Sequence, residues 1–389
     1  MRTTALQAFL VPLRPRRGAA TFAGISTEDV GQKSCLPHAD MASITFDRAI
    51  VPRDSMLDRH TRIDAAGHVD SDLAGLAPHE RFERMANQLL SGRLCVAGAS
   101  LAMAEEALFT TVAHARARAH RTGRDSWLPL FRHASYRHEL IAMLAEAYVR
   151  RVFTSAVQRA YAASQSKTEP ELVQAICAAK ATNSMFAREV LAACQERLGT
   201  DGLLTTSGIG KAYNASYPAM LVEGDSRILL HKIARDALRT LSRRALIQVG
   251  RATLPGGVQR RAALGRLLAR RELFAGLLLA RKMRGKHRSE AVHAWFESFE
   301  DDALAYGRAL CDRLVWDSFG QQTGDLDLGV DRLFALRCVR RDASGFARHA
   351  GLRSRQLALV DRAIQRLCDA LEPQLDRLLP SKPAVAHAA

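Results

Sequence analysis

The sequence is poor in the features that staple small or secreted folds together. Its seven cysteines are odd in number, widely spaced and never paired as CxxC, which argues against a disulfide framework and against a zinc site. We expect reduced, mostly buried thiols and no metal site, in a cytoplasmic protein. A chain of 389 residues, 48% of them hydrophobic, is long enough to bury a large core without such staples.

Long apolar runs and several common active-site motifs are also missing. The longest apolar runs, such as 274–280 (FAGLLLA), fall far short of the roughly 20 residues that a membrane-spanning helix needs, so we expect no membrane span. No GxGxxG follows a predicted strand, and no GxSxG is present. The GIGKA string at 208–212 lacks the first glycine and the final Ser or Thr of a phosphate loop.

Positive charge is concentrated in one part of the chain. The net charge is +16, and the stretch 227–288 contains 17 Lys or Arg against two acidic residues. Such a stretch can meet nucleic acid, an acidic membrane surface or a phosphate-rich ligand. Its apolar residues recur at helical spacing, however, which indicates a solvated helix face. Because only 6% of the residues are aromatic, the chain offers few platforms for stacking bases, and we expect no nucleic acid partner.

The chain changes character along its length, from a β-rich start to long helices. Residues 6–13 and 43–52 have the pattern of short strands. From about residue 78 onward, apolar residues recur at i, i+3, i+4 and i+7, with helices expected over 127–163 and 169–197. The best linker is 254–257. The fold class is therefore predicted to be mainly α, with a small β-layer followed by two helical bundles.

Glu223 stands out by its position in the sequence. It follows an apolar run at 220–222 and precedes Gly224 and the start of a helix. An apolar pocket disfavours the charged form of a carboxyl group, which suits a base that removes a weakly acidic carbon proton. A structural role is the alternative, because the helix dipole favours an acid in the first turn of a helix. The residues alone leave both interpretations open.

The segment around Glu223 resembles, without a gap, the segment that holds the catalytic glutamate in acyl-CoA oxidases and in the wider acyl-CoA dehydrogenase superfamily. The matching positions are Ser207, Gly208, Tyr213, Pro218, Glu223 and Gly224. The string 198–202 (LGTDG) is similar to the GG-x-G turn of that family, with Thr in place of one glycine. Residues 44–59 look like the end of the family's middle β-domain, and 292–314 look like the second helical domain of the oxidases.

The resemblance implies a domain organisation and a chemistry. Residues 1–62 would be a remnant of the middle β-domain, with a partial β-barrel. Residues 63–250 would form the first C-terminal helical bundle, which carries the catalytic glutamate, and residues 258–389 would form the second C-terminal helical domain. Glu223 would remove the α-proton of an acyl-CoA thioester while the β-hydrogen leaves as hydride to FAD, which gives trans-2-enoyl-CoA. The 166 residues after Glu223 favour the oxidase architecture over that of simple dehydrogenases.

The resemblance also assigns binding residues. The FAD contacts would be Gly199, Thr200, Gly202, Asp225, Arg227, Arg118 and Arg121, those at 199–202 reaching the cofactor of a neighbouring subunit. Gly224 and Tyr213 would contact the acyl-CoA substrate.

The sequence departs from the family in two places. The family places an N-terminal helical domain and the first half of the β-domain ahead of this region, and residues 118–123 (RAHRTG) replace its RRxFG string without the Phe. We therefore expect a homodimer or higher oligomer, or a partner chain that supplies the N-terminal half. The alternative function is a non-catalytic or half-enzyme helical subunit.

Overall fold

A computed structural model describes residues 7–77, 89–241, 260–284, 294–322 and 329–379, with isolated positions between 80 and 84. The chain divides into two compact units, Met1–Leu89 and Leu90–Ala389. The predicted linker at 254–257 lies outside the described residues, and the three-domain division made from the sequence stays a prediction.

In the residues that the structure describes, the first unit contains two small antiparallel sheets. Strand β1 (Ile25–Asp29) pairs with β2 (Ala42–Phe46), and β3 (Thr61–Ile63) pairs with β4 (Val69–Ser71). The strand predicted at 6–13 is wrong, because the described residues 7–13 make only the single bridge from Phe9 to Met56. Prolines within and just after it remove backbone donors that a ladder would need.

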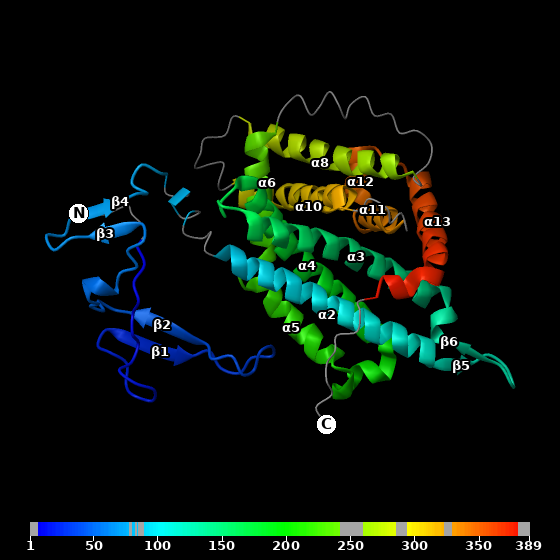
Figure 1. Ribbon diagram of the computed structural model, residues 1–389, viewed down its shortest axis with the longest axis horizontal. Coiled ribbons are helices and arrows are strands. Elements are labelled where there is room, and N and C mark those ends of the chain that lie inside the picture. The colour runs from blue at the N-terminus through cyan, green and yellow to red at the C-terminus, as the bar shows by residue number, and fades with distance from the viewer. Residues whose placement is uncertain are drawn as a thin grey trace. The chain divides into compact units, whose positions relative to one another are not determined.

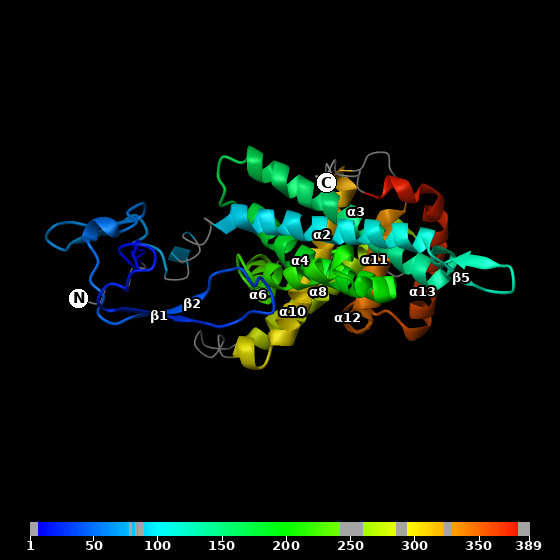
Figure 2. The same ribbon diagram turned by 90° about the horizontal axis from the view of Figure 1, so that it is seen from below.

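The second unit is a set of packed helices with one small hairpin (Figures 1 and 2). The helices are α2 (Leu90–Ala117), α3 (Ala134–Ala163), α4 (Pro170–Leu198), α5 (Ile209–Leu221), α6 (Ser226–Thr240), α8 (Arg261–Met283), α10 (Glu300–Gln322), α11 (Val330–Arg341), α12 (Ala343–Ala350) and α13 (Ser354–Leu371). The prediction of a mainly α fold with a small β remnant is confirmed.

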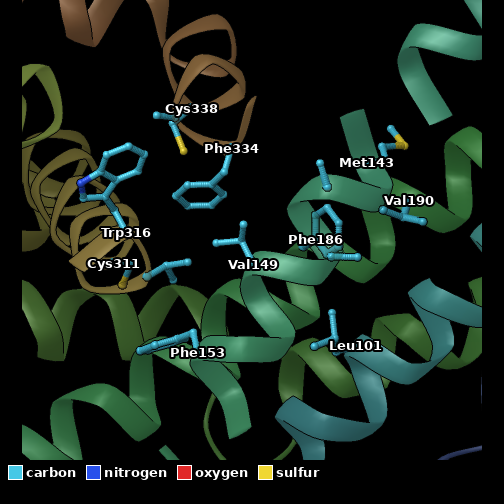
Figure 3. Close-up of a cluster of buried hydrophobic side chains, with 14 of the residues drawn as sticks. Leu101, Met143, Val149, Phe153, Phe186, Val190, Cys311, Trp316, Phe334 and Cys338 are labelled. Atoms are coloured by element: carbon cyan, nitrogen blue, oxygen red, sulfur yellow. The ribbon is translucent and has the colours of Figure 1, made fainter. Parts of the chain in front are cut away.

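Helices α2, α3 and α4 run side by side through the centre of this unit (Figures 1 and 2). Many of their buried residues are alanines, which let the helix backbones approach closely, and larger side chains such as Phe186 and Phe334 fill the remaining space (Figure 3). Among the described helices, α2 is long and apolar enough to cross a membrane. Its Leu94, Leu101 and Leu108 are buried in this core.

The predicted helix over 127–163 begins later than expected. Strands β5 (Ala119–Arg121) and β6 (Trp127–Pro129) form a hairpin that projects beyond the end of α2 (Figures 1 and 2), and α3 starts only at Ala134. Pro129 lacks the backbone N–H that a continuing helix would use. The helix predicted over 169–197 is confirmed as α4 to within one residue at each end.

The basic stretch is only partly a solvated face. Within its described residues, Arg271 is buried and lies between Asp312 and Asp342, with 2.7 Å to an oxygen of each. Arg261 pairs with Asp331 at 2.5 Å. Acidic side chains of the following helices and of the Asp342 turn therefore neutralise several of these arginines, which a count of charge along the sequence does not reveal.

Candidate active site

Glu223 lies in the short turn between α5 and α6. Helix α5 ends at Leu221, and the side chain of Asp225 caps α6 by accepting hydrogen bonds from the backbone N–H groups of Arg227 and Ile228, at 2.8 and 3.3 Å. The acid that stabilises the start of α6 is therefore Asp225. The structural alternative for Glu223, an acid inside the first helical turn, is wrong, because Glu223 precedes the cap.

The backbone at Glu223 has an unusual conformation. Its φ is +58°, in the left-handed region, and Gly224 follows with φ +100°. A residue with a long side chain adopts this region only when its surroundings enforce it, and such residues cluster at functional sites.

The Glu223 carboxylate lies against the start of α2. A methyl group at Gly92 would come within 2.5 Å of both Cδ and Oε1 of Glu223, so only glycine fits at this position with the carboxylate where it is. Atom Oε2 is buried and has no hydrogen-bond partner among the described residues. This oxygen therefore has an acceptor position that no described residue uses.

Two buried cations hold the turn from either side. Arg93, next to Gly92 on α2, donates from Nε to the backbone carbonyl of Glu223 at 3.0 Å and from Nη1 to Sγ of Cys177 at 3.6 Å. Lys180 on α4 donates from Nζ to the carbonyl of Gly224 at 2.7 Å. The turn that carries Glu223 is thus fixed by side chains of α2 and α4.

The apolar run before Glu223 does not close over the carboxylate in the described chain. Leu221 is 45% exposed and Val222 is 46% exposed, although the sequence predicted an apolar pocket here. The described residues therefore leave apolar surface next to Glu223 available for contact with a ligand or another chain.

The predicted cofactor residues at 199–202 form a second cluster. They belong to the tight turn η4 (Gly199–Leu203), where Gly199 has φ +57° and open space beside it, and Gly202 packs against the carbonyl of Gln195. In the middle of this turn, Asp201 accepts from Arg118 at 3.1 Å and lies 2.9 Å from Nε2 of His114. Arg118 and the 199–202 turn, assigned separately from the sequence, lie together.

The other predicted contacts are more dispersed. Arg121 donates to the carbonyls of Gly123 and Arg124 in its own hairpin, so it is not turned toward the 199–202 turn. The side chain of Arg227 is 57% exposed and lies 3.5 Å from Glu300. Tyr213 on α5 receives a hydrogen bond on its hydroxyl from Arg188 at 3.0 Å.

Sequence reasoning missed Gly92, Arg93 and Lys180. Each is distant in sequence from Glu223, and each acts through helix packing. The one available signal was Lys180 itself, a charged residue inside an alanine-rich stretch of a helix that is otherwise suited to burial. Among the described residues, no group of three or more His, Cys, Asp or Glu side chains could hold a metal ion.

Comparison with known proteins shows which sequences and folds this chain is similar to. Residues 82–238 match the sequence family described as acyl-CoA dehydrogenase, C-terminal domain. Acyl-coenzyme A oxidase 2, peroxisomal, from Arabidopsis thaliana is 24% identical over 239 residues, which cover 60% of this chain and 34% of that protein. Peroxisomal acyl-coenzyme A oxidase 3 from Homo sapiens is 24% identical over 252 residues, covering 61% and 35%. The chain spans about a third of the length of these curated relatives.

Solved structures extend the likeness to the fold of nearly the whole chain. Acyl-CoA oxidase 3 from Yarrowia lipolytica has a TM-score of 0.80 at 18% identity, covering 96% of this chain and 59% of that one. Acyl-CoA oxidase-1 from Caenorhabditis elegans, complexed with FAD and ATP, has a TM-score of 0.73 at 16% identity, covering 95% and 59%. The resemblance to the acyl-CoA oxidase and acyl-CoA dehydrogenase superfamily, for a chain that spans part of its relatives, is therefore confirmed.

Proposed function

We propose that this chain carries the base-bearing part of a flavin-dependent acyl-CoA oxidation site. Glu223 removes the α-proton of an acyl-CoA thioester, and the product is trans-2-enoyl-CoA. The observation that supports this best is Oε2 of Glu223, a buried oxygen with no hydrogen-bond partner among the described residues, on a turn whose backbone is held in a strained conformation. The superfamily resemblance supplies the substrate class.

The residues of the chain have distinct tasks in this proposal. Glu223 accepts the α-proton at Oε2, and its backbone N–H is one donor to the thioester oxygen, where negative charge develops as the proton leaves. The half-exposed Leu221 and Val222 present apolar surface beside the carboxylate and help exclude water. When bound, FAD supplies the redox chemistry by taking up the β-hydrogen with its electron pair.

The residues assigned to FAD fit the cofactor in part. The 199–202 turn offers open space at Gly199. Arg118 pairs with Asp201 of this turn but keeps 53% of its side chain exposed, which leaves a guanidinium edge for a phosphate-bearing cofactor. Asp225 and Arg227 lie next to Glu223. The two groups stand at opposite ends of α5, whose 13 residues span about 20 Å. We infer that the turn and Glu223 serve the cofactors of different subunits, in a homodimer or a higher oligomer.

An absorbance spectrum tests the proposal. The purified chain is incubated with FAD, desalted and scanned over the flavin bands, and acyl-CoA is then added without oxygen. We expect a retained flavin band that acyl-CoA bleaches. A retained band that no acyl-CoA bleaches would contradict the proposed function.

A half-enzyme subunit is the second candidate, and the separation of the two clusters is compatible with it as well. If FAD contacts come from another polypeptide, the isolated chain is colourless and gains flavin only with a partner that supplies an N-terminal helical domain. A homodimer that retains flavin counts against this candidate. The cytoplasmic location predicted from the sequence stays a prediction, and the two curated relatives cited above are named as peroxisomal proteins.

Substituting Gly92 tests the position of the carboxylate directly. In Gly92→Ala the new methyl group overlaps Cδ and Oε1 of Glu223, so the flexible carboxylate must move. A displacement of the catalytic carboxylate by about 1 Å lowers the rate of proton removal by up to about 100-fold. Because alanine is the better helix former, stability should hold or rise by up to about 1 kcal/mol. We expect slower flavin bleaching with an unchanged or higher Tm.

Gly98→Ala is the matched control for this experiment. Gly98 lies on the same helix, and its added methyl group would meet only Nε2 of Gln158, at 3.4 Å. It should gain the same helix stability and keep the bleaching rate. Equal rates in the two variants would show that the carboxylate works from another position.

A further inference from the structure

Lys180 is a fully buried lysine that points at the Glu223 turn. Its relative exposure is 0%, which is rare for a lysine without a carboxylate partner at hydrogen-bond distance. Its Nζ instead donates to three oxygens of one short segment: the carbonyls of Met220 at 2.9 Å and Gly224 at 2.7 Å, and Oγ of Ser226 at 3.2 Å.

These three acceptors bracket Glu223 on the chain. Met220 is in the last turn of α5, where carbonyls lack intrahelical partners, Gly224 follows Glu223 directly, and Ser226 begins α6. An ammonium has three donors, and all three are used here. Ser226 also bonds to Ser184 at 2.9 Å and to the Met220 carbonyl at 3.0 Å, which closes a small buried network behind the turn.

We propose that Lys180 is a positioning residue for Glu223. Its buried ammonium ties the end of α5 to the start of α6 and thereby holds the backbone between them, including the left-handed φ of Glu223, in the conformation that aims the carboxylate. This inference rests on the proposed function, because it assigns Lys180 to the same reaction. The structural part, that Lys180 fixes the turn, can be measured without the reaction.

The charge of Lys180 is sensitive to pH within an accessible range. Burial, together with the positive charge of Arg93, lowers the pKa of Lys180 to about 8. Asp225, Glu223 and Cys177 act in the opposite direction, because they favour the charged form. A neutral amine has two donors and a lone pair, so one of its three oxygens loses its partner when the proton leaves. The turn should therefore loosen as the pH rises through about 8.

Lys180→Met tests the inference with a side chain of similar length and no charge. The readouts are amide hydrogen exchange over 220–227 by mass spectrometry, and incorporation of deuterium at the α-carbon of an acyl-CoA in D2O, measured by NMR with FAD present. We expect faster amide exchange in the turn and α-proton exchange slowed by about 10- to 100-fold. Binding of the acyl-CoA should change by less than about threefold, since the substrate does not touch Lys180.

Lys282→Met is the matched control, because it removes the charge of a lysine whose ion-pair partner, Asp302 of α10, lies outside the Glu223 turn. It should leave both readouts at wild-type values. A Lys180→Met protein with unchanged amide exchange in the turn, or with α-proton exchange within about twofold of wild type, would overturn the positioning role.

A measurement on the unmodified chain keeps the inference testable if Lys180→Met does not fold. Amide exchange over 220–227, corrected for the intrinsic rate, is compared between about pH 7 and about pH 9.5, on either side of the pKa of Lys180. The turn should lose protection relative to α10, and α-proton exchange should decline with a midpoint near pH 8. Constant relative protection would contradict the inference.

Failure of the inference is distinguishable from failure of the proposed function. If Glu223 is not the base, Glu223→Gln retains α-proton exchange, whatever Lys180→Met does to the amides of the turn. If only the positioning role is wrong, Glu223→Gln abolishes α-proton exchange and Lys180→Met leaves it intact.

Discussion

Replacing Glu223 with glutamine is expected to slow α-proton removal from an acyl-CoA by about 1,000-fold, within the range that a general base contributes. The amide has nearly the shape of the carboxylate but cannot accept a proton at the position of Oε2. The measurement is deuterium incorporation at the α-carbon in D2O, followed by NMR, with the rate of flavin bleaching as a second readout. The first of these reports on the base alone, without the redox step.

The fold should tolerate this substitution, because Glu223 makes no ion pair among the described residues and Oε2 has no partner there. We expect a change in the free energy of unfolding of less than about 1 kcal/mol. Glu171→Gln is the matched control, since Glu171 is an exposed carboxylate in the first turn of α4, remote from the turn. A Glu223→Gln protein that exchanges α-protons as fast as Glu171→Gln would refute the assignment of the base.

The helix start after Glu223 could be predicted from the sequence because its context is local. The apolar run at 220–222, the glycine after it and the start of a helix are adjacent residues, and α6 begins at Ser226 as that pattern indicates. The left-handed φ of Glu223 itself was not predictable. Glycine is the usual residue at a positive φ, and the sequence has its glycine one position later, at 224.

The residues that hold Glu223 could not be predicted, because they act across long sequence separations. Arg93 is 130 residues from Glu223, and Lys180 is 44 residues from Gly224. Which side chain of α2 or α4 reaches the turn depends on the rotation of each helix about its axis, and periodicity gives only the buried face. Gly92 carried no local signal, since a glycine near a helix start is common.

The hairpin at 119–129 shows a different limit. Strands of three residues are too short for an alternating pattern to be recognised, and the flanking helical periodicity extends over them. The basic stretch shows a third limit, since Arg271 counts toward the net charge of the sequence but is buried between two aspartates.

The second large effect is expected at Glu146, a carboxylate with no exposed surface in α3. Arg150 approaches its Oε1 at 2.7 Å, and two arginines of α11 complete the cluster: Arg337 lies 2.6 Å from Oε2 and Arg341 lies 3.2 Å from Oε1. Arg150 also stacks on Phe186 and Phe334, both shown in Figure 3. Glu146 thus joins α11 to the central helices.

Glu146→Gln should destabilise the protein by about 3 to 5 kcal/mol, because it leaves the buried guanidinium of Arg150 without its carboxylate and leaves Arg337 and Arg341 with Glu189 alone. The measurement is unfolding in urea. The urea concentration at the midpoint should fall, while the dependence of the unfolding free energy on urea concentration stays constant if the unfolded state is unaffected. Asp361→Asn is the control, because Asp361 of α13 pairs with Arg340 of the same helix α11 at 3.7 Å on an exposed surface. An exposed pair of this kind is worth about 1 kcal/mol or less.

The pH dependence separates the charge of Glu146 from its packing. Burial alone would raise the pKa of Glu146, but Arg341, Arg150 and Arg337 together hold it well below the ordinary value of 4.5. A carboxyl group with a lowered pKa in the folded state contributes stability that is present above the unfolded-state pKa and is lost as the pH falls below it. The stability difference between wild type and Glu146→Gln should therefore shrink as the pH falls below about 4.5. Two results would contradict this expectation: a stability difference that stays constant below that pH, or a loss of stability at neutral pH no larger than that of Asp361→Asn. Either would mean that shape complementarity joins α11 to α3, with no contribution from the buried charge.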